Sequence, residues 1–203
     1  AYMVCLACET DFVAKNEEFG KTVAQILDAA VAADAADMEA LLATKAGDRT
    51  VGELVTEKSG QTGEKVELPF YSRVEAPYVT AYVHTNKKLG AMIGFNKEVP
   101  EELAKDVAMQ ATAMNPVAID ESSIPAEVLA TEHKIGREQA AQDGKPENML
   151  DKIAEGKVKK FIKENTLINQ DFVKDPKETV GQHIKSVDKD AEVTAYVRFS
   201  LND

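Results

Sequence analysis

The passage from Tyr2 to Val31 constrains the fold of this chain most strongly. Tyr2–Ala7 is an apolar run that predicts a β-strand, and the polar stretch after it predicts a turn. A helix is then predicted over Glu17–Ala33, because apolar residues recur at helical spacing in Phe19, Val23, Ile26, Leu27, Ala30 and Val31. A fold that accommodates this passage needs a helix packed beside a strand.

The same organisation of strand, polar turn and amphipathic helix recurs later in the chain. Met92–Phe95 predicts a strand and Asn96–Pro100 a turn, and the helix after them carries Leu103, Val107, Ala111 and Met114. Pro100 suits the first turn of that helix, where a missing N–H costs nothing. Residue identity between the two passages is low, so the duplication is inferred from the pattern. It predicts two similar sub-domains.

Further strands are predicted between and after these passages. Residues 66–70, 79–83 and 91–95 are strand-like segments linked by short connections, and they predict an antiparallel sheet. A clean alternation of apolar and polar residues at Glu192–Leu201 predicts a strand that returns to this sheet. The predicted class is therefore α+β, with two antiparallel-sheet sub-domains and packed helices.

Two amphipathic helices joined by a sharp break form another part of the prediction. The first runs over Pro125–Gln142, the break is Asp143–Pro146, and the second carries Leu150, Ala154, Val158 and Phe161. Each helix has only a narrow apolar stripe, which suffices for its partner helix. The sequence therefore predicts a projecting antiparallel helical, or coiled-coil, hairpin. After it, Asp175–Glu178 has the residues of a helix start, with aspartate as N-cap and proline behind it.

These elements divide the chain into three predicted parts. Residues 1–75 form the first core sub-domain, with a strand, a helix, short helices and a second strand. Residues 76–120 and 168–203 together form the second core sub-domain. Residues 121–167 form the helical hairpin arm between its two halves.

The composition argues against binding of nucleic acid or membranes. The formal net charge is −11, whereas phosphate recognition needs clustered lysine and arginine. No apolar run approaches the ~20 residues that a membrane span requires, so a cytoplasmic protein is expected.

Cys5 and Cys8 lack the two further ligands of a zinc site, and two buried or half-buried thiols are expected. No metal and no cofactor is predicted.

The motifs of common enzyme classes are missing from the sequence. It has no glycine-rich nucleotide loop, no His-Glu-x-x-His and no nucleophile elbow. The three histidines, His84, His133 and His183, are scattered along the chain. A non-enzymatic function is therefore expected. An enzyme of unrecognised type and a scaffolding module whose hairpin binds a partner remain as alternatives.

The turn after the first strand holds the residues that bear most on function. Thr10 and Asp11 both suit a helix N-cap, because a short side-chain oxygen satisfies the free N–H groups of a helix. On that structural interpretation Asp11 only caps and Phe12 packs inward. The alternative is that the acid and the aromatic ring are presented together to a partner.

Several short motifs along the chain carry a resemblance to a known family. The first is Thr-Asp-Phe-Val-Ala-Lys at Thr10–Lys15, directly after an apolar strand. The others are, in chain order, Tyr82–His84, Gly90–Gly94, Met109–Pro116, Ala126–Val128, Gly144–Pro146, Glu155–Phe161, Asp175–Gln182 and Ala191–Phe199. Taken in this order, they resemble the bacterial elongation factor Ts family across nearly the whole chain.

The resemblance implies a guanine-nucleotide exchange factor that binds elongation factor Tu·GDP and promotes GDP release during translation elongation. In the family the matching stretch dislodges Mg²⁺ from elongation factor Tu, so this role would fall on Thr10, Asp11, Phe12 and Val13. His84 would supply a second contact. Members usually begin with a small three-helix domain, and the chain resembles only the core that follows it. A homodimer and a hetero-tetramer both stay open.

Overall fold

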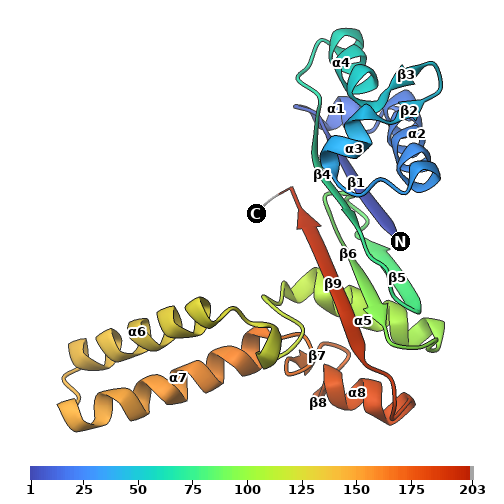
Figure 1. The fold of residues 1–203 in the computed structure, drawn as a ribbon. Helices are drawn as coiled ribbons and strands as arrows, with labels where there is room; N and C mark the ends of the chain where they lie inside the picture. Colours follow the sequence, from blue (N-terminus) through green and yellow to red (C-terminus); the bar gives the residue numbers. More distant parts are fainter. Residues whose placement is uncertain (202–203) are drawn as a thin grey trace. The chain divides into compact units, whose positions relative to one another are not determined.

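The computed structural model describes residues 1–201 of the chain, and the chain divides into two compact units (Figure 1). The first unit is Ala1–Glu75 and the second begins at Ala76. Helices and small sheets occur in both units, and every pair of named strands in the described residues is antiparallel. The predicted α+β class is therefore confirmed.

The first unit places one long helix beside a two-stranded sheet. β1 (Tyr2–Ala7) pairs with β4 (Glu67–Arg73), with Met3 opposite Ser72. The elements between these strands are α1 (Asp11–Ala14), α2 (Glu17–Ala33), α3 (Met38–Ala43), β2 (Lys45–Ala46), β3 (Arg49–Thr50) and α4 (Val51–Thr62).

The helix α2 has the bounds that the sequence predicts. Its N-cap is Asn16, whose side-chain oxygen accepts a hydrogen bond from the Glu18 N–H at 2.8 Å. Two large side chains of this helix, Phe19 and Ile26, are buried in one core cluster. The sheet and the other helices of the unit contribute further residues to that cluster. At its other end Asp34 takes a left-handed conformation with φ of 46°, which ends the helix.

The predicted pairing of β4 is wrong. The sequence suggests that residues 66–95 form one sheet, but β4 pairs with β1, and β5 (Tyr78–Val83) pairs with β6 (Leu89–Phe95). The connection between β4 and β5 ends in Ala76-Pro77. The pairing of β4 with the first strand continues one residue beyond β4, since the Val74 N–H donates to the Ala1 carbonyl at 2.8 Å.

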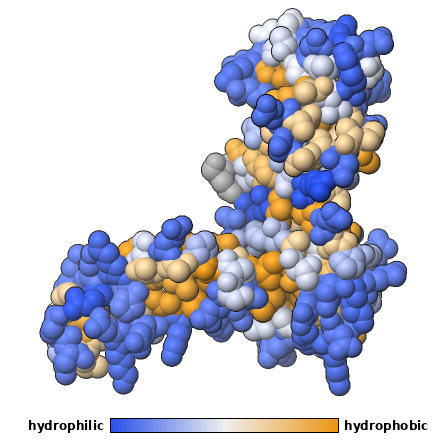
Figure 2. Space-filling view, viewed as in Figure 1, coloured by the Kyte–Doolittle hydropathy of each residue, from blue (hydrophilic) through white to orange (hydrophobic). Residues whose placement is uncertain are grey.

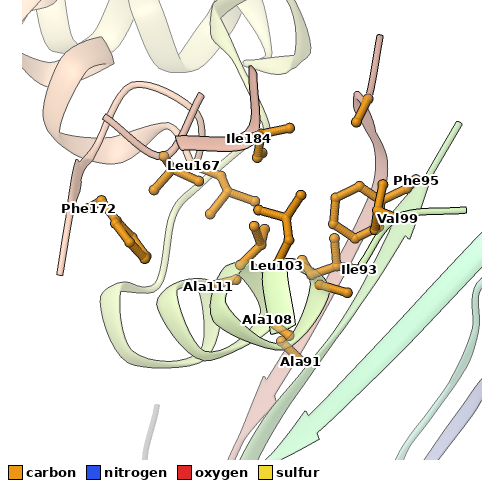
Figure 3. Packing of buried hydrophobic residues seen from close by; sticks show 14 residues of the cluster. Ala91, Ile93, Phe95, Val99, Leu103, Ala108, Ala111, Leu167, Phe172 and Ile184 are labelled. Carbon is orange, nitrogen blue, oxygen red and sulfur yellow. The ribbon is translucent and has the colours of Figure 1, made fainter. Parts of the chain in front are cut away.

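The second unit is built on a three-stranded sheet in the order β5-β6-β9, with β9 (Val193–Ser200) as the predicted returning strand. α5 (Glu101–Met114) covers one face of this sheet. Alternate side chains of β6 point into the core (Figure 3) because side chains along a strand alternate between its faces. The core residues of β6 and α5 are Ala91, Ile93, Phe95, Leu103, Ala104, Val107, Ala108 and Ala111.

The segment after the hairpin folds differently from the sequence prediction. Residues Asp175–Thr179 form β8, which pairs with β7 (Asp171–Phe172), so no helix starts at Asp175. The helix is α8 (Val180–Val187), which begins after a capping box between Thr179 and Gln182. Two cap-like motifs compete here, and the helix forms where Val180 and Ile184 are buried in the core.

The predicted helical hairpin forms within the second unit. It consists of α6 (Ala126–Gln142) and α7 (Leu150–Asn165), with short 3₁₀ turns at Glu121–Ser123 and Glu147–Met149. Figure 2 shows hydrophobic residues along the middle of the hairpin and hydrophilic residues over its outer edges. At its base the Leu167 N–H donates to the carbonyl of Ala118 at 2.9 Å.

Replacing Gly136 by leucine is expected to loosen the hairpin. A Cβ at Gly136 would lie 3.2 Å from the Ala154 Cα of the facing helix, which is tighter than ordinary packing allows. Such overpacking typically costs about 1–3 kcal/mol. Amide hydrogen exchange in α6 and α7 should therefore become faster. Gly156→Leu is the matched control, because Gly156 is exposed and a Cβ there meets nothing within 4 Å.

Candidate functional site

The candidate site is the turn that joins β1 to α2 in the first unit. A single helical turn, α1, covers Asp11–Ala14, and Thr10 is its N-cap with extended backbone dihedral angles. The Thr10 side-chain oxygen accepts a hydrogen bond from the Val13 N–H at 3.4 Å. Thr10 therefore takes the capping role, and Asp11 lies in the first turn, where a carboxylate is favoured by the helix dipole.

Phe12 points away from the core of its unit. Its side chain is 93% exposed, the largest value among the exposed large hydrophobic residues in the described part of the chain. The next residue, Val13, is half-buried and packs against the core, and successive residues of a helical turn point in different directions. The structural interpretation in which Phe12 packs inward is therefore wrong.

The exposure of Phe12 has an energetic consequence. Burying a phenylalanine side chain contributes about 1.5–3 kcal/mol relative to leaving it exposed. Phe19, on the next helix, realises this gain, since only 5% of it is exposed. The exposed Phe12 side chain does not gain this free energy within its own unit, so burial against a partner surface can still provide it.

Glu64 holds the turn by hydrogen bonds, although the two segments are far apart in the sequence. One carboxylate oxygen of Glu64 accepts hydrogen bonds from the N–H groups of Glu9 at 3.1 Å and Thr10 at 3.0 Å. The Thr10 hydroxyl donates to the other oxygen. In return, the Glu9 carboxylate accepts a hydrogen bond from the Lys65 N–H at 3.1 Å. The sequence analysis does not identify Glu9 or Glu64, because contacts across 54 to 56 residues leave no local signal.

The two cysteines beside the turn are free thiols, and both are half-buried as predicted. Burial raises the pKa of Cys5 to about 11 and is also the main reason that the pKa of Cys8 is raised. Neither thiol is therefore activated as a nucleophile at neutral pH. Within residues 1–201 no group of three or more histidine, cysteine or acidic residues is placed to hold a metal ion.

A small hollow beside the turn does not resemble a cofactor site. Its volume is about 200 Å³, and its lining includes Val13, Asn16 and Lys58. Pockets that enclose cofactors or drug-sized ligands are typically about 300–1,000 Å³ and mostly apolar. The arrangement at this turn therefore suits contact with another macromolecule better than binding of a small molecule.

His84 lies in the second unit, at the start of the connection between β5 and β6. It is exposed, and its Nδ1 lies 3.4 Å from the Tyr82 hydroxyl oxygen. Its backbone closes the turn, since the His84 N–H donates to Leu89 at 2.9 Å and its carbonyl accepts from Lys87 at 2.8 Å. Within its unit His84 is thus presented to solvent on a defined backbone.

Comparison with known proteins identifies the class. A family model described as elongation factor Ts matches residues 9–203. Elongation factor Ts of Azobacteroides pseudotrichonymphae genomovar. CFP2 is 44% identical over 203 residues, covering 100% of this chain and 74% of that relative. The Porphyromonas gingivalis (strain ATCC 33277) protein is 42% identical, with the same coverage. Elongation factor Ts of Kineococcus radiotolerans is 41% identical over 202 residues, covering 97% of this chain and 72% of the relative.

These matches define the chain as a translation elongation factor of the nucleotide-exchange class. It belongs to the elongation factor Ts family, whose role is guanine-nucleotide exchange on elongation factor Tu. Exchange of this kind makes and breaks no covalent bond in the nucleotide.

None of the helices described between residues 1 and 201 is long and apolar enough to cross a bilayer.

Proposed function

We propose that the chain binds elongation factor Tu·GDP through the turn Thr10–Val13 and promotes GDP release by dislodging Mg²⁺ from the nucleotide site. Phe12 enters an apolar slot of the GTPase, and the Asp11 carboxylate competes for polar partners of the nucleotide site. The observation that carries this proposal is the exposed aromatic ring on a turn that is capped and tied to the rest of its unit.

The mechanism needs only a difference in affinity. An exchange protein that binds the GTPase more tightly when the nucleotide site is distorted also weakens the binding of the nucleotide. The two affinities change by the same ratio, because coupling between two sites is reciprocal. Couplings of this kind are typically about 1–3 kcal/mol. Inserting one phenylalanine into an apolar slot contributes about 1.5–3 kcal/mol, which is the required size.

The remaining parts of the chain have proposed supporting roles. His84, on the second unit, makes a second contact with elongation factor Tu, so that the GTPase is held while Phe12 acts. Residues 76–120 and 168–203 act as one core sub-domain, and residues 121–167 act as a separate arm. The proposed location is the cytoplasm, where translation takes place.

A mixing experiment tests the function as a whole. Elongation factor Tu is loaded with fluorescent GDP and mixed with excess unlabelled GDP, with and without the chain. Faster loss of fluorescence in the presence of the chain is the expected result. Release at the same rate with and without the chain would refute the proposed function.

Shortening the hairpin tests whether it acts as a separate arm. Deleting the tip around Gly144–Pro146 should leave the core of the second unit folded. The buried residues next to the tip, Ala140 and Leu150, lie on α6 and α7, which pack on each other, and neither belongs to the core cluster of the unit. Thermal unfolding of the core, followed by circular dichroism, is expected to keep its midpoint. A midpoint that falls by many degrees would show that the hairpin is part of the core instead.

A further inference from the structure

We propose that Glu64 is a positioning residue for nucleotide exchange: its carboxylate holds the turn that presents Phe12, and thereby fixes the direction in which the ring projects. This inference rests on the proposed function, because it assigns a role within the same site. Glu64 itself need not touch elongation factor Tu.

The geometry of Glu64 is that of a two-pronged acceptor. Both of its carboxylate oxygens are used, and together they accept from the two successive backbone N–H groups of Glu9 and Thr10 and from the Thr10 hydroxyl. Hydrogen bonds to a carboxylate are about twice as strong as neutral ones. The three donors lie at the point where β1 has ended and α1 has not yet begun.

The placement of Glu64 follows from the end of α4. Gly63 ends that helix in a left-handed conformation with φ of 70°, a conformation that glycine adopts at no steric cost. The chain reverses there, which brings Glu64 to the turn, and Lys65 returns a hydrogen bond to the Glu9 carboxylate. Two chain segments 54 to 56 residues apart are therefore joined by reciprocal contacts.

The turn needs such an anchor because it has little stability of its own. α1 contains four residues, and helices this short are not stable in isolation. Val13 packs on the core, but Phe12 is exposed and contributes no such contact. Loss of the Glu64 contacts should therefore let the turn sample several conformations, of which only a fraction presents Phe12 correctly. The apparent affinity for a partner falls by that fraction.

The experiment compares Glu64→Ala, which removes both acceptor oxygens of the anchor, with Glu39→Ala. Both substitutions remove one negative charge from the first unit, but Glu39 is exposed on α3, away from the contacts of the turn. Two properties are measured on the full chain. The first is the mobility of residue 12, by fluorescence anisotropy decay in a Phe12→Trp background. The chain contains no tryptophan, so the signal comes from position 12 alone. The second is GDP release from elongation factor Tu, titrated with the chain in the native Phe12 background.

The expected result separates positioning from folding. Glu64→Ala should increase the local motion of the indole ring at position 12 and raise the concentration for half-maximal GDP release by about tenfold, while saturating amounts of the chain restore the full rate. The thermal midpoint of Glu64→Ala should fall by no more than a few degrees, because the three lost hydrogen bonds are exposed to solvent. The Glu39→Ala control should behave like the native chain in both measurements. A general loss of folding would also raise the half-maximal concentration, because it too lowers the fraction of competent chain. It would, however, lower the thermal midpoint by many degrees.

The two readouts also separate the failure of this inference from the failure of the proposed function. Unchanged motion of the indole ring in Glu64→Ala would overturn the positioning role, whatever happens to GDP release. Increased motion with an unchanged titration would also overturn it, and it would show in addition that presentation of Phe12 does not limit exchange. If the native chain fails to accelerate GDP release at all, the proposed function fails, while the anisotropy still reports whether Glu64 orders the turn.

Discussion

Replacing Phe12 by alanine is expected to slow GDP release from elongation factor Tu by about thirtyfold or more at concentrations of the chain below saturation. An aromatic anchor at the centre of an interface commonly contributes about 2 kcal/mol or more to binding. The free energy of unfolding should change by no more than about 0.5 kcal/mol, because the side chain is 93% exposed and leaves no cavity in the core. Fluorescent GDP release and chemical denaturation, measured on the same preparation, provide both numbers.

Asp11→Ala is the companion variant for this test. Thr10 is the residue that caps α1, so Asp11→Ala leaves the cap in place and should cost less than the about 1 kcal/mol that loss of an N-cap typically costs. Slower GDP release in both variants, with normal stability, is expected. Loss of stability without loss of exchange would return both residues to a purely structural role.

Replacing Phe19 by alanine should have the opposite effect on the two measurements. Phe19 is 5% exposed in the core cluster of the first unit, and removing a buried phenylalanine side chain costs about 3–5 kcal/mol. That is a large part of the about 5–15 kcal/mol that stabilises a typical protein. The midpoint of denaturation should therefore fall sharply.

The effect of Phe19→Ala on exchange should follow from folding alone. GDP release should slow only in proportion to the fraction of unfolded chain, and a stabilising osmolyte should restore it. The same osmolyte should leave the Phe12→Ala defect in place. A Phe19→Ala protein of normal stability would contradict the description of this core.

Some elements could be predicted closely from the sequence because local physics determines them. The helix α2 has the predicted bounds, since its apolar spacing covers the whole segment and Asn16 supplies a cap. β9 and the helical hairpin also follow from periodicity and from the break at Asp143–Pro146. In these cases the residues that specify the element lie within the element itself.

Other elements depend on choices that the sequence pattern leaves open. Alternation identifies β4 as a strand but does not select β1 as its partner, because a strand edge offers the same backbone groups to either neighbour. At Asp175 the cap-like residues lie five positions before the helix α8, and burial of Val180 and Ile184 decides between the two starts. Tertiary packing decides both outcomes.

The candidate site was partly predictable for the same reason. A cap at this turn follows from the sequence, which offers both Thr10 and Asp11, but the interpretation in which Asp11 caps is wrong, since Thr10 is the N-cap. The outward direction of Phe12 does not follow from the sequence, which fits an inward aromatic equally well. The anchoring by Glu64 joins distant segments, and only the three-dimensional structure reveals it.

The Mg²⁺ dependence of GDP release tests the central claim most directly. The acceleration of release by the chain is measured once with saturating Mg²⁺ and once after chelation of the ion by EDTA. If the chain acts by dislodging Mg²⁺, prior removal of the ion makes part of its action redundant, and the acceleration should be about 5- to 150-fold smaller, the range of typical site-to-site coupling. An acceleration of equal size with and without Mg²⁺ would contradict the account.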